Sequence, residues 1–165
     1  MSDKAVQPTT LAYLAGIIDG DGFVSITRSI RNGVVYFAAQ VGIGNTQRAP
    51  LDLAAAIWGG KVCSYAPRNL RHRTQFQWQR MERAAGAILT DLQPYLLLKS
   101  EHAKLAIELQ TLLDAQRRGE PVDAEALHAM REQMIEMNQS RNRSRRFPGR
   151  NPTTFPNMEA TNANS

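Results

Sequence analysis

The chain has 165 residues, 42% of them hydrophobic, and a formal net charge of +5. This length supports one ordinary domain with its own core and is short for two. No stretch approaches the ~20 apolar residues of a membrane span, and the N-terminus lacks the basic-then-apolar pattern of a secretory signal. Cys63 is the single cysteine, which excludes an internal disulfide and a cysteine-based zinc site and suits an intracellular location.

The charge is unevenly distributed along the sequence. A basic block at 23–80 and a basic C-terminal segment from 139 flank an acidic block at 81–138. This distribution suggests a polyanionic partner, with a solubilising surface charge as the alternative. Charge alone does not separate DNA, RNA and an acidic membrane.

The first part of the chain predicts a helix and a hairpin. Residues 1–9 are expected to form a flexible lead before an apolar helix that ends near Gly22. Residues 23–31 and 34–43 are rich in β-branched types and partly alternate, which predicts two strands. Asn32-Gly33 between them indicates a tight hairpin turn.

The next segment predicts a short helix and a second hairpin. Pro50 suits the first turn of a helix over 50–58. Strands near 61–67 and 74–80 then flank a basic loop. In the second of these strands aromatic residues alternate with glutamines, which is typical of a strand with one buried and one polar face.

From residue 82 the apolar period becomes helical. Helices are expected before Pro94, over about 99–116 and over about 124–138. Residues 139–165 have few apolar side chains and are expected to be a basic, extended or disordered tail. The predicted order is α-ββ-α-ββ-α followed by extra helices, an α+β class without an internal repeat.

The first predicted helix ends in Leu14-Ala15-Gly16-Ile17-Ile18-Asp19-Gly20-Asp21-Gly22. Gly16 would let two such helices approach closely. Asp21 lies at the C-terminal end of the helix, where the backbone dipole is negative, so its carboxylate calls for a compensating cation. If two helices pack together, a divalent metal relieves the repulsion between their Asp21 carboxylates, and hard oxygen ligands favour Mg²⁺. The alternative is a turn that merely ends a helix.

This segment resembles the LAGLIDADG signature of homing endonucleases. Seven of nine positions match, with Ile17 in place of Leu and Gly20 in place of Ala. The α-ββ-α-ββ-α order over 10–98 is similar to the core domain of that family. The resemblance implies one domain over 10–138, with a curved antiparallel four-stranded DNA-binding saddle and C-terminal helices.

The resemblance implies a site-specific endonuclease that hydrolyses phosphodiesters of double-stranded DNA and propagates an intron or intein. The expected cofactor is Mg²⁺, with Mn²⁺ or Ca²⁺ as other hard cations for the site. One motif in a chain of this size resembles the homodimeric members, which cut long, roughly palindromic sites. The partners would be a DNA target and a second copy, with no membrane and no small-molecule substrate. The dimer interface would comprise Leu14, Ala15, Gly16, Ile17, Ile18 and Asp19.

The resemblance also assigns roles in the catalytic pocket. Asp21 would bind the metal, with the Gly20 carbonyl as a further ligand. Asn45, with Gln47 close by, stands where the family often has Gln or Lys; Asn can orient a water but cannot neutralise charge. Arg48 and Lys99 match basic positions that would stabilise the developing phosphorane charge, with ordinary surface cations as the alternative.

Strand alternation selects the side chains of the saddle that would enter the major groove. For any single one of them, a solvated strand position is the alternative. Gln pairs well with adenine and Arg with guanine, but sequence does not sort base contacts from phosphate contacts. The selected strand residues are Ser25, Thr27, Ser29, Tyr36, Ala38, Gln40, Lys61, Cys63, Tyr65, Gln75 and Gln77. The hairpin-tip residues are Arg31, Arg68, Arg71 and Arg73.

Two other functions are compatible with the sequence. One is an RNA maturase or a DNA-binding regulator on the same scaffold without nuclease activity. The presence of both Asp19 and Asp21 favours the nuclease, because loss of activity usually replaces the acids of the motif. The other is a generic basic interaction domain, for which the motif would be a coincidence.

Overall fold

One antiparallel sheet and the helices packed on it make up the part of the chain that this computed structural model describes, residues 6–66 and 73–145. The α+β class and the α-ββ-α-ββ-α order followed by further helices are confirmed. No helix in these ranges is both long and apolar enough to cross a bilayer. The elements are α1 (Pro8–Asp21), β1 (Gly22–Arg31), β2 (Val34–Asn45), α2 (Ala49–Trp58), β3 (Cys63–Tyr65), β4 (Gln75–Met81), α3 (Glu82–Leu92), the 3-10 helix η1 (Gln93–Tyr95), α4 (Ser100–Arg117) and α5 (Ala124–Arg145).

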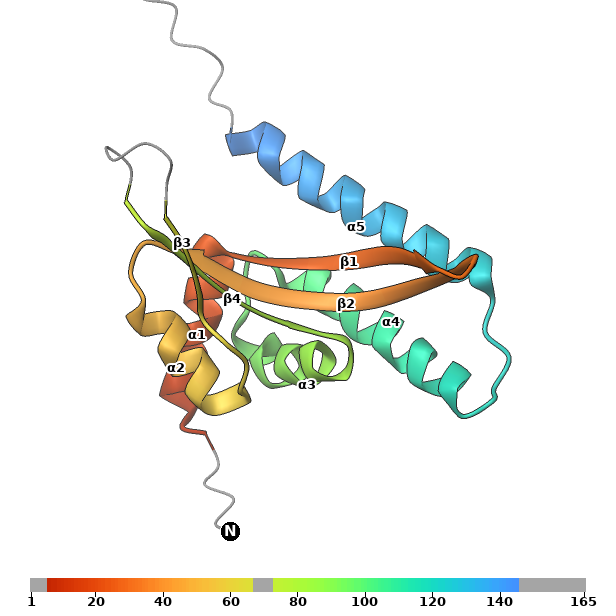
Figure 1. Ribbon diagram of the computed structural model, residues 1–165, viewed down its shortest axis with the longest axis horizontal. Coiled ribbons are helices and arrows are strands. Elements are labelled where there is room, and N and C mark those ends of the chain that lie inside the picture. Colours follow the sequence, from red (N-terminus) through yellow and green to blue (C-terminus); the bar gives the residue numbers. More distant parts are fainter. Residues whose placement is uncertain (1–5, 67–72, 146–165) are drawn as a thin grey trace, which may run out of the picture.

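The four strands have the order β1-β2-β4-β3, and each neighbouring pair is antiparallel. The long hairpin of β1 and β2 curves along its length (Figure 1). Asn32 and Gly33 have φ angles of 51° and 77°, the left-handed pair that a two-residue hairpin turn requires. β3 is shorter than the expected strand at 61–67 and comprises only Cys63–Tyr65.

The core lies on one face of this sheet. Val24, Val41, Ile43 and Trp78 are fully buried there against residues from α1, α2, α3, α4 and α5. The opposite face bears exposed side chains such as Tyr36, 49% exposed. Among the described residues, the helices therefore cover one face of the sheet and leave the other open.

Gly22 joins α1 to β1 at a point where two backbone segments nearly touch. A Cβ at this position would lie 2.6 Å from the Ile18 Cα and 2.8 Å from the Gly42 carbonyl oxygen. Both neighbours are backbone atoms and cannot rotate away. The motif therefore ends in glycine because the helix crosses directly against the sheet.

The last helix, α5, runs along the outer side of the edge strand β1 (Figure 1). The side chain of Asn138 donates Nδ2 to the Val24 carbonyl oxygen at 3.2 Å. The helix continues to Arg145, so the expectation of an extended chain from 139 is wrong for residues 139–145. Likewise, α1 begins at Pro8, inside the segment expected as a flexible lead. Residues 146–165 lie outside the described part of the chain.

Replacement of Gly22 by alanine is expected to lower the free energy of unfolding by about 1–3 kcal/mol, because the added methyl group overlaps fixed backbone. Gly44→Ala is the matched control, since a Cβ at Gly44 meets no atom within 4 Å. Urea unfolding of both variants tests this. Equal stability of the two variants would contradict the close approach at Gly22.

Candidate functional site

Asp21 is the last residue of α1, and its side chain is exposed. Asn45, at the end of β2, donates Nδ2 to Asp21 Oδ2 at 2.8 Å. The other end of this amide, Asn45 Oδ1, accepts the backbone N–H of Gln47 at 2.8 Å. Because a backbone N–H can only donate, this contact fixes the direction in which the Asn45 amide points. Asn45 therefore orients the Asp21 carboxylate, and the expectation that it also orients a water stays a prediction.

Asp19 points into the protein instead. It is only 7% exposed. Its carboxylate accepts the backbone N–H groups of Leu97, Leu98 and Lys99 at 2.8, 3.1 and 2.9 Å. Hydrogen bonds to a charged acceptor are among the stronger ones, so this set holds the segment before α4 firmly against the end of α1. Asp19 has a structural role within the protomer.

Lys99 is buried beneath the end of α1, with 3% of its surface exposed. Its ammonium donates to the carbonyl oxygens of Ile18 and, at 2.8 Å, of Asp19. The last carbonyls of a helix lack partners within the helix and carry the negative end of its dipole, so a cation there is favourable. Lys99 therefore anchors α1 from inside the protomer, and its expected role in stabilising the phosphorane charge stays a prediction.

Gln47 and Arg48 precede α2, and both are exposed. Arg48 Nε donates to the two carboxylate oxygens of Asp52 at 3.0 and 3.1 Å. Its guanidinium also lies 5.9 Å from the ring centre of Phe76. An ion pair this exposed contributes little to stability and can be exchanged for another anion. These contacts bring Arg48 to the side of Phe76, not to Asp21.

A hollow of about 460 Å³ opens beside Asp21 and joins it to the outer surface of the sheet. It lies where β1 begins and where the ends of β2, β3 and β4 meet. Its lining combines one carboxylate with aromatic rings and amides. The lining residues are Asp21, Gly22, Phe23, Gly44, Tyr65, Gln75, Phe76 and Gln77. The acidic site and the outer surface of the sheet are thus continuous.

The strand register shows which side chains share that outer surface. Ser25 lies opposite Gln40, Thr27 opposite Ala38, Ser29 opposite Tyr36, Cys63 opposite Gln77 and Tyr65 opposite Gln75. The predicted strand residues of β1, β2, β3 and β4 therefore do share one face, and their binding to DNA stays a prediction. We call this surface the polar face and define it as Phe23, Ser25, Thr27, Ser29, Tyr36, Ala38, Gln40, Cys63, Tyr65, Gln75, Gln77 and Gln79.

Some of the predicted contact residues lie elsewhere or offer little surface. Ala38 is on the polar face but only 9% exposed. Lys61 is exposed but precedes β3. Arg31 lies at the end of β1, with its guanidinium 5.9 Å from the ring centre of Tyr36. Arg73 is exposed just before β4, and Arg68 and Arg71 lie outside the described residues.

Two members of the polar face were missed in the sequence. Gln79 continues the alternation of Gln75 and Gln77, and that signal was sufficient to find it. The Phe23 ring lies over Gly42, where a Cβ would come within 2.5 Å of it. Phe23 directly precedes the polar part of its strand, and nothing in the sequence indicated that it would lie on the outer surface.

The expected dimer interface divides between the two sides of α1. Leu14, Ala15 and Ile18 are fully buried in the core of their own protomer, so their expected role in the interface is corrected. Ile17 is half-buried, and Gly16 is exposed.

The outer side of α1 presents small residues. Ala12, Gly16 and Gly20 are exposed at four-residue spacing, beside Tyr13, which is 51% exposed. A Cβ added at Gly16 or Gly20 would meet no atom within 4 Å. The fold of the protomer therefore does not require glycine at either position.

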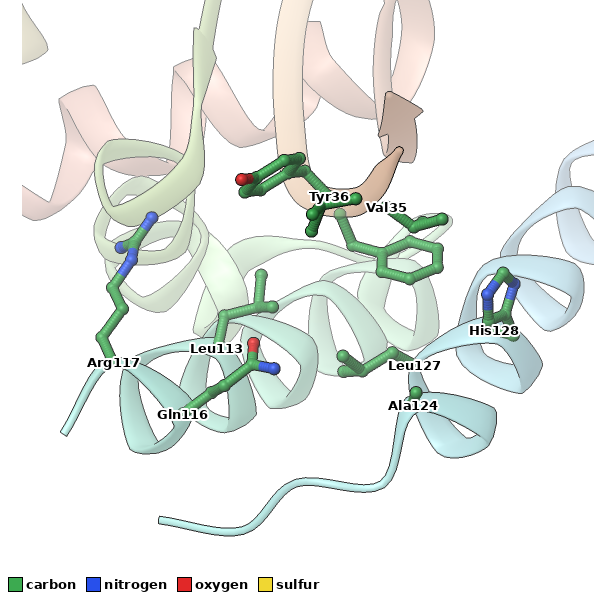
Figure 2. A pocket seen from close by; sticks show the side chains of 10 residues that line it. Val35, Tyr36, Leu113, Gln116, Arg117, Ala124, Leu127 and His128 are labelled. Atoms are coloured by element: carbon green, nitrogen blue, oxygen red, sulfur yellow. The ribbon is translucent and has the colours of Figure 1, made fainter. Parts of the chain in front are cut away.

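A second hollow, of about 350 Å³, lies at the other end of the first hairpin (Figure 2). The start of β2 and the facing parts of α4 and α5 line it, with Leu113 and Leu127 on the helical side. The rings of Phe37 and His128 meet edge to face, with 4.8 Å between their centres. None of the described residues that line this hollow is acidic, so it does not resemble the site at Asp21.

Replacement of Lys99 by methionine is expected to lower the free energy of unfolding by about 1–3 kcal/mol, because it removes the buried hydrogen bonds from the ammonium to the Ile18 and Asp19 carbonyl oxygens. Lys104→Met is the control: its ammonium pairs with Glu101 at 2.6 Å on a side chain that is 55% exposed. Thermal unfolding measures both. A Lys99→Met protein as stable as the unaltered one would contradict the anchoring role.

This architecture is also found in proteins of known structure. No protein-family model matches the sequence, and no curated protein matches it. Solved structures do match. The homing endonuclease I-CvuI, solved with its target in the presence of Ca, is 21% identical; the match covers 89% of this chain and 87% of that chain with a TM-score of 0.61. I-Vdi141I, an archaeal intron-encoded homing endonuclease complexed with DNA, is 13% identical over 78% of this chain and 84% of that chain, with a TM-score of 0.64.

A third match shows how the chain relates to a longer protein. The LAGLIDADG homing endonuclease I-SmaMI, solved bound to cleaved DNA, is 13% identical with a TM-score of 0.56. That match covers 81% of this chain but 46% of the other, so this chain corresponds to about half of it. The expected architecture is confirmed: the chain has the fold of the LAGLIDADG homing endonucleases.

Proposed function

We propose that this protein is a site-specific double-stranded DNA endonuclease that depends on a divalent metal and acts as a homodimer. The observation that carries the proposal is the position of Asp21, whose exposed carboxylate opens directly onto the polar face. A ligand lying along the polar face would therefore bring its backbone to the acid. Proteins of the same fold have been solved with DNA, and one of them, I-CvuI, was solved in the presence of Ca and, in a second structure, of Mg.

The residues at this site fit a hard cation that is shared between the protein and its substrate. Among the described residues, no three His, Cys, Asp or Glu side chains converge on one point. Mg²⁺ does not need such a cage, because it commonly binds one or two carboxylates together with waters and substrate phosphates. Asp21 of each copy would supply the carboxylate, and the Gly20 carbonyl is a candidate second ligand.

The residues around Asp21 have separate tasks. Asn45 fixes the direction of the carboxylate, and Arg48 can exchange Asp52 for a phosphate at the rim. The polar face would position the duplex in its major groove. A divalent cation held by Asp21 would supply an activated water and stabilise the departing oxygen.

Two copies would meet along the outer side of α1. Small residues at four-residue spacing let two helix backbones approach closely, as Ala12, Gly16 and Gly20 would here. Leu97 and Leu98 extend this surface with apolar side chains that are 85% and 64% exposed. The Asp19 carboxylate holds their backbone at the end of the same helix. Pairing along this surface would bring the two Asp21 carboxylates near a common axis.

Cleavage of duplex DNA is the direct test. The unaltered protein, incubated with a library of duplexes and Mg²⁺, is expected to cut both strands of a small subset. Asp21→Asn is expected to lower the rate by roughly a thousandfold or more, because it removes the charged ligand. Excess EDTA should abolish cutting by the unaltered protein.

Sequencing of the cut ends measures these outcomes. Cleavage that persists in Asp21→Asn would contradict the assigned metal ligand. Sequence-specific binding without any cleavage by the unaltered protein would instead support a maturase or a DNA-binding regulator on this scaffold.

The pairing surface is tested separately by Gly16→Leu. The protomer has open space at Gly16, so the variant is expected to fold, but the added side chain would hold two helices apart. Sedimentation is expected to show a dimer for the unaltered protein and a monomer for Gly16→Leu. Ala56→Leu, on the exposed surface of α2, makes a similar change away from this surface and should remain dimeric. A dimeric Gly16→Leu protein would overturn pairing through α1.

A further inference from the structure

Four side chains of the polar face are joined by hydrogen bonds across three strands. Ser25 Oγ donates to Gln40 Oε1 at 3.1 Å, and Gln40 Nε2 donates to Gln79 Oε1 at 2.9 Å. Gln77 Nε2 reaches the same Gln79 oxygen at 3.4 Å. The register explains these contacts: Gln40 lies opposite Met81, so Gln79 is its diagonal neighbour, within reach of a long side chain.

The donors of this network point toward Gln79, whose side-chain oxygen is the last acceptor. An amide oxygen has two lone pairs, and Gln79 Oε1 accepts two hydrogen bonds, so it has no acceptor site left for a ligand. No hydrogen bond among the described residues uses the two N–H groups of Gln79 Nε2. Gln79 therefore offers only donors to whatever lies on the polar face.

We infer that Gln79, held in place by Gln40 and Gln77, selects a guanine in the DNA target. In the major groove guanine presents two neighbouring acceptors, N7 and O6, and can therefore use both N–H groups of Gln79. Adenine presents an acceptor beside a donor, thymine a single acceptor beside a methyl group, and cytosine a donor. A glutamine free to use both ends of its amide pairs with adenine, but one whose oxygen is already occupied matches guanine. The inference rests on the proposed function, because it requires duplex DNA against the polar face.

Base preference on a randomised duplex library tests this. The full-length protein is mixed with the library in EDTA, so that nothing is cut, and bound duplexes are separated and sequenced. Gln79→Glu is the decisive variant, because its carboxylate still accepts from Gln40 and Gln77 but presents acceptors to the groove. Gln79→Met removes both kinds of group. Gln133→Glu makes the same change in charge on the exposed surface of α5 and serves as the control.

The unaltered protein and Gln133→Glu are expected to enrich guanine at one position of each half-site by roughly tenfold, the discrimination typical of a good base contact. Gln79→Glu is expected to enrich cytosine at that position, and Gln79→Met to lose the preference there. Thermal unfolding checks that each variant folds; Gln79→Met carries the test if Gln79→Glu does not.

The outcomes separate the inference from the proposed function. If the unaltered protein enriches no sequence, the proposed function fails and the inference fails with it. If it enriches a sequence that the Gln79 variants share unchanged, only the inference is overturned. Adenine at the position that Gln79→Glu alters would also overturn it.

Discussion

The C-terminal end of α1 is held from inside by two buried charges of opposite sign. The Asp19 carboxylate accepts three backbone N–H groups from the segment before α4, and the Lys99 ammonium donates to the last carbonyls of the helix. Each side chain binds backbone groups of the other segment, so removing either one would leave buried backbone groups with fewer hydrogen bonds. Successive residues of a helix are about 100° apart, so a residue two positions beyond Asp19 faces the opposite side. Fixing Asp19 inward therefore directs Asp21 outward, toward the hollow and the polar face.

The sequence predicted the order of the elements and the first hairpin turn, because alternation, helical period and Asn32-Gly33 are local signals. It did not separate the two sides of α1, since Leu14, Gly16 and Ile17 are all apolar or small and both sides suit burial. Whether Lys99 is a surface cation or a buried anchor depends on the Asp19 contacts, which join residues about eighty positions apart in the chain. α5 runs past Asn138 because the next strong helix breaker in the sequence is Pro148, whereas low hydrophobicity suggested an earlier end.

The polar face, as defined above, contains glutamine amides and no charged side chain. An array of glutamines is neutral, and its members can hydrogen bond to one another before a ligand arrives. Side chains that are already ordered lose less conformational entropy on binding, which favours affinity and a defined direction of each donor. The contact between Asn45 and Asp21 follows the same logic, because a backbone N–H sets the amide and the amide sets the carboxylate. Both in the glutamine array and at Asp21, side chains that are held by hydrogen bonds within the protein therefore determine the geometry of the surface.

The helix along β1 also affects how the protein can aggregate. An uncovered edge strand is a template for pairing with another chain, and proteins protect such edges by covering them or by keeping them short. Here α5 lies along one edge, and Asn138 occupies a carbonyl of β1 that would otherwise be open to a foreign strand. In the described part of the chain, the opposite edge is β3, only three residues long. Neither edge therefore offers a long uncovered strand for pairing with another chain, so self-association is left to helical surfaces.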